Sequence, residues 1–417
     1  MNYLERIRAG AYLDVYRIPA VAGLMIISTA CGALVQPGGQ VPTPQRPSHP
    51  EGLIAVDAVS STVRPERRDF SEQRMRAQGL ENPRGVTVTE NGDVNVAERE
   101  GGRVRLLRDT NGDGRADVSR IVAEDLNEGL EGVHAFAVRQ NRLYMVTVRE
   151  LYSAPIQADG GLGEPELHID DIPDGGQHPN RTMRWGPDGM LYLSVGSQTN
   201  GVPEHDEESA TILRINPANW EREIFAEGLR NTIGFGWHPV SGHLYGLDHN
   251  TDPKGDNWPP EELNRIQQGR HFGWPWCGGN REVDWHVAQN PEGNMSREQF
   301  CAQTEPPVLR YTAHAAPMQM VYYTGNRFPA EYRNDAFVTM RGSWNRNPPI
   351  GYEVVRIRFN EAGEPVEMQP FVSGWLVDGG RAHFGRLMGL AQAADGSLLV
   401  GDDSNGVIYR IWYAGGQ

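Results

Sequence analysis

Residues 183–197 read MRWGPDGMLYLSVGS, and this pattern decides the fold: two short apolar runs joined by a turn that contains Gly189. Such an arrangement is typical of a β-hairpin, because Gly supplies the positive φ that a tight turn needs. Five further stretches repeat it: 85–98 (GVTVTENGDVNVAE), 134–148 (HAFAVRQNRLYMVTV), 234–250 (GFGWHPVSGHLYGLDHN), 320–344 (MVYYTGNRFPAEYRNDAFVTMRGSW) and 388–403 (MGLAQAADGSLLVGDD). Several copies are followed by another apolar run, which indicates three or four strands in each unit.

The spacing of the repeats predicts the architecture. The turns lie near Gly92, Asn141, Gly189, Gly242, Asn334 and Gly396, at intervals of 49, 48, 53, 92 and 62 residues. A repeat near 50 residues with three or four strands is typical of a β-propeller. We therefore predict an all-β, six-bladed β-propeller, with an insertion in the long interval. Two stacked β-sandwiches would also give hairpins, but not one register that recurs along the chain.

Charge and cysteine content exclude several classes. The chain has 417 residues and a formal net charge of −15. Nucleic acids are polyanions that bind to basic surfaces, so this charge argues against a nucleic acid partner. Its 49 Gly and 29 Pro residues suit many strands joined by turns. Its 3 Cys residues exclude a disulfide-dense scaffold and a zinc site of four thiolates.

The N-terminus has the layout of an export signal. An apolar run of about 15 residues follows Arg6, Arg8 and Arg17, and small residues precede Cys31. We expect a signal or lipoprotein anchor over 1–35, a flexible tether over 36–60 and the propeller over 61–417. The protein would then be exported, periplasmic and anchored by lipid at Cys31. The alternatives are a plain signal peptide and an uncleaved anchor.

Cys277 and Cys301 are 24 residues apart in a stretch rich in Trp, Pro, Gly and Asn. An oxidising compartment favours a disulfide between them, closing the inserted loop. The alternative is two independent thiols.

Two acidic loops are candidate calcium sites. In DTNGDGRAD, Asp109, Asn111, Asp113 and Asp117 occupy positions 1, 3, 5 and 9 of a calcium loop, and Gly114 occupies the turn position. Position 12 is Arg120, so a complete EF-hand is excluded. A truncated structural calcium loop and a solvated acidic turn both remain open. The second loop, at 247–266, reads LDHNTDPKGDNWPPEELNRI and contains five carboxylates, including those of Asp248 and Glu262. Either a bound cation neutralises these carboxylates, or the loop is a solvated acidic loop.

Polar residues enter the first strand of four blades at equivalent places. They are His178, Arg230 with Asn231, His314 and Arg386. In a propeller these loops converge at one end of the central channel. A His base with two Arg residues indicates a ligand with carboxylates and a substrate that loses a proton.

At these residues the chain resembles the pyrroloquinoline quinone (PQQ)-dependent sugar dehydrogenases of the glucose/sorbosone dehydrogenase family, and is nearer to the sorbosone-type members. The similarity covers about residues 82–413 and is most specific in 228–239 (GLRNTIGFGWHP), 259–277 (PPEELNRIQQGRHFGWPWC), 316–329 (APMQMVYYTGNRFP) and 337–346 (FVTMRGSWNR). The family fold is also a six-bladed propeller.

The resemblance assigns roles residue by residue. His178 matches the catalytic base, Arg230 the arginine beside the reacting quinone carbon, and Asn231 a quinone contact. Arg386 matches an arginine that pairs with the cofactor's carboxylates, and Arg341 lies within one residue of a cofactor-binding lysine. His314 is taken with this cofactor-binding group because it enters the fifth blade. Glu262 matches a ligand of structural calcium, and the calcium that holds the quinone is expected around Asp248 and His249.

Two positions depart from the glucose enzymes: Ser197 stands where an Asp pairs with the catalytic His, and Met388 where a second cofactor arginine lies. The resemblance implies an oxidoreductase that passes a hydride from a sugar-like alcohol or hydrated aldehyde to PQQ, with Ca²⁺ as a second cofactor. Without a C-x-x-C-H haem motif in the sequence, a separate electron acceptor is expected. The alternatives are a calcium-dependent sugar-lactone hydrolase and a non-catalytic propeller that binds a polysaccharide or protein.

Overall fold

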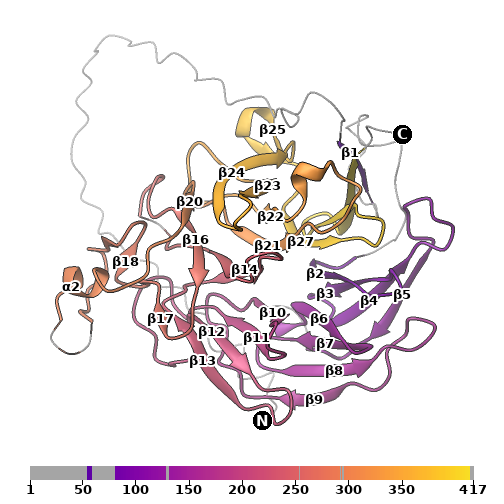
Figure 1. The fold of residues 1–417 in the computed structure, drawn as a ribbon, viewed down its shortest axis with the longest axis horizontal. Coiled ribbons are helices and arrows are strands. Elements are labelled where there is room, and N and C mark those ends of the chain that lie inside the picture. The colour runs from indigo at the N-terminus through magenta and orange to yellow at the C-terminus, as the bar shows by residue number, and fades with distance from the viewer. Residues whose placement is uncertain are drawn as a thin grey trace, which may run out of the picture. The chain divides into compact units, whose positions relative to one another are not determined.

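The computed structural model describes residues 54–58, 80–127, 131–252, 254–291, 293 and 295–413. The chain divides into two units, Met1–Gly39 and Gln40–Gln417, and all described residues belong to the second. Six sheets of this unit form a six-bladed β-propeller, so the predicted fold class is confirmed (Figure 1). The predicted signal over 1–35, with Cys31, lies outside the described residues.

The blades follow one another along the chain, and neighbouring strands within each blade are antiparallel. Blade 1 consists of β2 (Pro83–Val88), β3 (Val94–Glu98), β4 (Arg103–Arg108) and β5 (Val118–Ala123), and blade 2 of β6 (Ala135–Arg139), β7 (Arg142–Val146), β8 (Leu151–Pro155) and β9 (Glu166–Ile169). Blade 3 consists of β10 (Arg181–Trp185), β11 (Leu191–Val195), β12 (Thr211–Ile215) and β13 (Arg222–Glu227), and blade 4 of β14 (Thr232–Trp237), β15 (Leu244–Asp248), β16 (Glu261–Ile266) and β20 (Leu309–Tyr311). Blade 5 consists of β21 (Pro317–Tyr322), β22 (Ala336–Met340), β23 (Glu353–Phe359) and β24 (Pro365–Val372), and blade 6 of β27 (Leu387–Gln392), β28 (Leu398–Asp402), β29 (Val407–Tyr413) and β1 (Ile54–Ala58).

The first strands of the six blades meet around the centre. β2, β6, β10, β14, β21 and β27 each contact the next, and β27 contacts β2, which closes the ring. The centre is crowded: a Cβ added at Gly85 would lie 2.5 Å from the carbonyl oxygen of His134, and one at Gly234 would lie 2.3 Å from that of Met318. Glycine therefore permits this close approach of backbones.

Apolar side chains fill the spaces between blades. Six separate clusters of buried residues each join two neighbouring blades, and the cluster between blades 5 and 6 holds Phe328, Phe337 and Phe371. Burial of both faces of most sheets explains why many strands read as continuous apolar runs. The hydrophobic effect thus holds the ring together blade by blade.

The predicted hairpin turns are confirmed. Gly92, Asn141, Gly189, Gly242, Asn334 and Gly396 all have positive φ, between 56° and 89°. The ring is also tied by β1, which pairs with β29 as the outer strand of blade 6. A strand of the propeller therefore lies at Ile54–Ala58, inside the stretch for which the sequence predicts a tether.

The long interval holds an insertion between β16 and β20, as predicted. It contains β17 (Arg270–His271), which joins the edge of blade 3, the ribbon of β18 (Cys277–Gly278) and β19 (Glu282–Val283), and the helix α2 (Arg297–Cys301). The predicted Cys277–Cys301 disulfide is present, with a Cα–Cα distance of 5.7 Å. Elsewhere lie η3 (Ala330–Tyr332), η4 (Asp378–Gly380) and the ribbon of β25 (Leu376–Val377) and β26 (Ala382–His383). Among the described residues, no helix is long and apolar enough to span a membrane.

Candidate active site

Six predicted site residues line one cavity of about 550 Å³: His178, Arg230, Asn231, His314, Arg341 and Arg386. His178, Asn231, His314 and Arg386 lie just before or at the start of the first strands of blades 3, 4, 5 and 6, and Arg341 follows the second strand of blade 5. Loops at these places converge because every blade runs in the same direction from its first strand. The structure therefore brings these six predicted residues together in one cavity.

His178 is held as a neutral imidazole. Its Nδ1 donates to the carbonyl oxygen of Ser197 at 2.7 Å. The Ser197 hydroxyl lies 2.8 Å from the same nitrogen and donates its own proton to the Thr199 carbonyl oxygen at 2.7 Å. Burial and the nearby charge of Arg230 lower the pKa of His178 to about 3. Because the hydrogen bonds of this ring to other described residues use Nδ1, the Nε2 lone pair remains for a ligand.

Arg230 is buried and fixed by five acceptor atoms, one of which is the His249 carbonyl oxygen at 3.4 Å from Nη1. Its Nε and Nη2 donate to the carbonyl and side-chain oxygens of Asn200 at 3.0 and 2.7 Å, and its Nη1 donates to the Asn250 carbonyl at 2.8 Å. Asp252 lies 3.3 Å from Nη2. Desolvation lowers the pKa of Arg230, although Asp252 and Asp248 oppose this. The guanidinium is thus a rigid positive charge beside His178.

Asp248, predicted as a calcium ligand, positions the loop of Arg230. Its two oxygens accept from the backbone N–H groups of Arg230 and Asn231, each at 2.9 Å, and from the Thr232 hydroxyl at 2.7 Å. Burial raises the pKa of Asp248 to about 6. Its cross-strand partner Glu262 is also buried and accepts from the Asn250 amide at 2.8 Å. Burial, and then Asp248, raise the pKa of Glu262.

The other predicted calcium loop is an exposed hairpin between β4 and β5. Asp109 accepts from the backbone N–H groups of Gly112 and Gly114, both at 2.7 Å, and Asn111 and Asp117 also accept from N–H groups of the loop. Asp113 does the same for Arg115. Within the described residues, no group of three or more His, Cys, Asp or Glu side chains is placed to hold a metal ion. Calcium binding by either loop stays a prediction.

One side of the cavity is strongly basic. Arg84, Arg99, Arg341 and Arg386 line it together with Arg230. Arg84 and Arg341 share the buried carboxylate of Asp403, at 2.7 and 2.9 Å. Burial, with Arg99 and Arg341 nearby, lowers the pKa of Arg84 to about 9. The buried Nε atoms of Arg84 and Arg99 have no hydrogen-bond partner among the described residues.

This arrangement fits an anionic cofactor such as PQQ. The cavity is lined by five guanidinium groups and by only two carboxylates, those of Asp252 and Glu261, among the described residues. Two of the guanidinium groups carry an N–H donor that has no partner among those residues. Guanidinium groups bind carboxylates through charge-assisted, often paired hydrogen bonds. Met388, which stands where a second cofactor arginine is expected, packs with Ile233 and Met318 in a small apolar cluster instead. Arg84 and Arg99 supply basic groups from blade 1.

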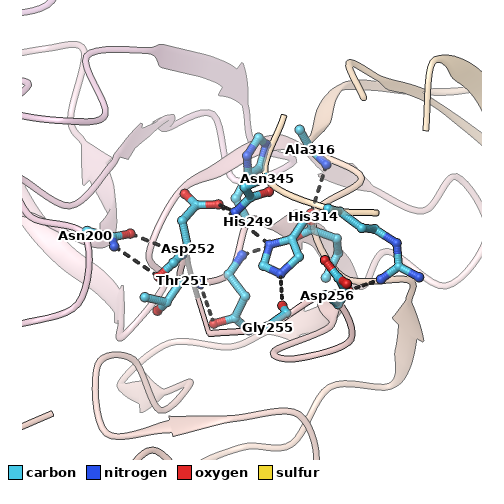
Figure 2. Close-up of polar contacts among 12 residues, drawn as sticks. Asn200, His249, Thr251, Asp252, Gly255, Asp256, His314, Ala316 and Asn345 are labelled. Atoms are coloured by element: carbon cyan, nitrogen blue, oxygen red, sulfur yellow. Dashed lines mark hydrogen bonds and ion pairs between the residues drawn. The ribbon is translucent and has the colours of Figure 1, made fainter. Parts of the chain in front are cut away.

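A second group of polar residues lines the cavity on the side of blade 4, and Figure 2 shows the contacts among them. Asp252 accepts from the Asn345 amide at 2.7 Å and lies 3.6 Å from Nδ1 of His314. The Nε2 atom of His314 contacts the Gly255 carbonyl at 2.8 Å. The nearby carboxylate of Asp252 raises the pKa of His314. His314 is therefore tied to the loop of blade 4.

Several residues of the cavity were not predicted from the sequence. Among them are Arg84, Arg99, Asn180, Trp344 and Asn345. The other site residues lie at the start of the first strand of a blade or just after its second strand. Arg84 and Arg99 have the same placement in blade 1, because Arg84 lies at the start of β2 and Arg99 directly follows β3. Applying this placement to blade 1 would have found them.

Comparison with known proteins gives the family. A family model described as TrAA12-like matches residues 68–414. The chain belongs to the TrAA12-like family. An uncharacterized protein of Borreliella burgdorferi is 34% identical to this TrAA12-like protein over 225 residues, which are 54% of this chain and 57% of that protein. The pyrroloquinoline quinone-dependent pyranose dehydrogenase of Coprinopsis cinerea is 23% identical over 404 residues, covering 80% of this chain and 52% of that protein. The TrAA12-like chain thus spans a little over half the length of these two relatives.

Solved structures share the fold of this TrAA12-like protein. The holo PQQ domain of the Coprinopsis cinerea pyranose dehydrogenase has a TM-score of 0.69 at 20% identity and covers 90% of this chain and 99% of that chain. The calcium structure of a Trichoderma reesei family AA12 enzyme has a TM-score of 0.70 at 18% identity, with coverage of 89% and 100%. The apo aldose sugar dehydrogenase of Escherichia coli has a TM-score of 0.58 at 16% identity, with coverage of 87% and 100%. At these identities the likeness shows the fold, and the sorbosone-type assignment stays a prediction.

Proposed function

We propose that this protein is a PQQ-dependent oxidoreductase that removes a hydride from a sugar-like alcohol or hydrated aldehyde. The observation that carries the proposal is the cavity in which a neutral His178 faces a ligand space lined by five arginines. The PQQ-dependent pyranose dehydrogenase among the relatives supports the same reading. The sorbosone-type substrate preference remains the finer form of this proposal.

PQQ would supply a two-electron hydride acceptor. Arg84, Arg99, Arg341 and Arg386 would bind its carboxylates, and Arg230 with Asn231 would lie beside its reactive end. His178 would accept the proton of the substrate hydroxyl at Nε2, because Nδ1 is committed to Ser197. The uncharged Ser197 fixes the ring without stabilising an imidazolium as a carboxylate does. Since Arg230 is one cause of the low pKa of His178, an anion bound beside Arg230 would raise that pKa.

Calcium is proposed as the second cofactor, supported by the buried cross-strand carboxylates of Asp248 and Glu262, of which Asp248 accepts from the backbone N–H groups of the cavity residues Arg230 and Asn231. Electrons would leave to a separate acceptor. We also propose export to the periplasm with lipid attachment at Cys31, which the Cys277–Cys301 disulfide supports because disulfides persist in oxidising compartments. Palmitate labelling of the wild type and of Cys31→Ala, with cell fractionation, tests this: label retained by Cys31→Ala would contradict lipid attachment there.

The test of the enzymatic proposal is reconstitution. Apo-protein is titrated with PQQ and Ca²⁺ while the quinone absorbance is followed, and dye reduction is then measured with a panel of pyranoses and aldoses. His178→Gln should keep the spectral shift and lose dye reduction at least a hundredfold, as expected for loss of a general base. The matched control is His205→Gln, because His205 is exposed and does not line the cavity. No spectral shift at micromolar PQQ would refute the proposal.

A further inference from the structure

The rim of the cavity carries an exposed indole. Trp344 follows β22 and lines the cavity, and the residue is 71% exposed, the highest value for a large apolar residue in the described part of the chain. Within that part it has no ring or cation partner. Its place in the lining of the cavity, and not its exposure alone, distinguishes this indole, because it puts a large apolar ring where a ligand would bind.

The backbone around Trp344 is fixed on both sides. The N–H of Ser343 donates to the Ile350 carbonyl at 2.9 Å, and the Tyr352 hydroxyl donates to the Ser343 carbonyl at 2.6 Å. On the other side, the Asn345 amide donates to Asp252 of blade 4 at 2.7 Å (Figure 2). The indole therefore stands on a fixed backbone, and little backbone entropy remains to be lost when a ligand contacts it.

We propose that Trp344 forms a carbohydrate-binding subsite, in which the indole stacks on the apolar C–H face of a pyranose ring. A sugar ring presents such a face together with hydroxyl groups, and the cavity offers both the indole and the polar side chains of His178 and Asn231. The subsite deepens the proposed sugar oxidoreductase and rests on it for the identity of the ligand. Trp344 is a positioning residue, since it sets where the ring lies and takes no part in proton or hydride transfer.

The chain provides a matched control. Trp285 is 67% exposed and belongs to the insertion, it does not line the cavity, and the guanidinium of Arg297 lies 5.8 Å from its ring centroid. Substitution of Trp285 therefore removes an equally exposed indole without touching the proposed subsite.

Steady-state kinetics of the reconstituted enzyme test the subsite. Trp344→Ala should raise KM for a pyranose roughly tenfold and leave kcat within about twofold, because an aromatic stacking contact is worth about a factor of ten. Trp344→Phe should recover part of the loss, and Trp285→Ala should match the wild type. Two results would overturn the subsite: an unchanged KM for the sugar with weaker PQQ binding, which places the indole on the cofactor, or an altered KM only for the electron acceptor.

A second measurement needs no turnover. Saturation-transfer NMR on the apo-protein with methyl glucoside should show transfer to the ring C–H protons, and the signal should fall at least fivefold in Trp344→Ala but not in Trp285→Ala. Transfer that depends on Trp344 in a protein that never reduces dye would keep the subsite and refute the proposed reaction. If Trp344→Ala reduces dye with an unchanged KM for the sugar and shows unchanged saturation transfer, the subsite is refuted and the proposed reaction is kept.

Discussion

Asp403→Asn tests the electrostatic support of the cavity. The Asp403 side chain is 1% exposed, and one of its oxygens accepts from Arg84 at 2.7 Å and from Arg341 at 2.9 and 3.0 Å. Asparagine keeps the shape and removes the only carboxylate that pairs with these two guanidinium groups among the described residues. Removing one partner of a buried ion pair costs about 3–5 kcal/mol. Because the Arg341 side chain is 27% exposed, water screens part of the loss, and we expect the lower end, about 3 kcal/mol.

Urea unfolding of the apo-protein, followed by tryptophan fluorescence at pH 7, measures this change. Glu166→Gln is the control: Glu166 and Arg142 form a surface pair at 3.0 Å with side chains 65% and 33% exposed, and its loss should cost less than about 1 kcal/mol. Asp403→Asn should also bind PQQ several-fold more tightly, since Arg84 and Arg341, which line the cavity, lose the negative charge that partly neutralises them. A free energy of unfolding within 1 kcal/mol of the wild type would refute the view that Asp403 holds the basic side of the cavity together.

Three further predictions concern the disulfide, the buried imidazole and the cofactor. The double variant Cys277→Ser and Cys301→Ser should lose roughly 3 kcal/mol of stability by loop entropy, measured by urea unfolding without reductant, and an unchanged midpoint would contradict it. His178 has a pKa of about 3 in the folded protein against about 6.5 unfolded, so its contribution is complete above pH 6.5 and is lost as pH falls toward 3. The wild type should therefore lose about 2 kcal/mol more than His178→Gln between pH 7 and pH 5, and equal losses would show that the imidazole titrates normally. Arg386→Met should weaken PQQ binding at least tenfold in a spectroscopic titration, because a charge-assisted contact to a carboxylate is removed, and an unchanged affinity would place the carboxylates elsewhere.

The number of blades could be predicted because it depends on local chemistry. Each hairpin turn needs a residue that tolerates positive φ, and Gly189 and Asn141 mark such turns in the sequence as plainly as in the structure. The recurring turns also place the loop before each first strand, which is how His178, Arg230 and Arg386 were found. The insertion and its disulfide followed from an irregular interval and from cysteine spacing.

Tertiary structure alone decided which charges meet. Arg84 pairs with Asp403 across 319 residues, and Asn345 reaches Asp252 across 93 residues. The strand β1, which completes blade 6 beside β29, likewise pairs across nearly the whole chain. A turn is specified by the residues that form it, whereas a contact between distant loops depends on closure of the ring and leaves no periodic signal in the sequence. The sequence by itself therefore determined the repeating blade, and only the closed ring determined the basic cavity at its centre.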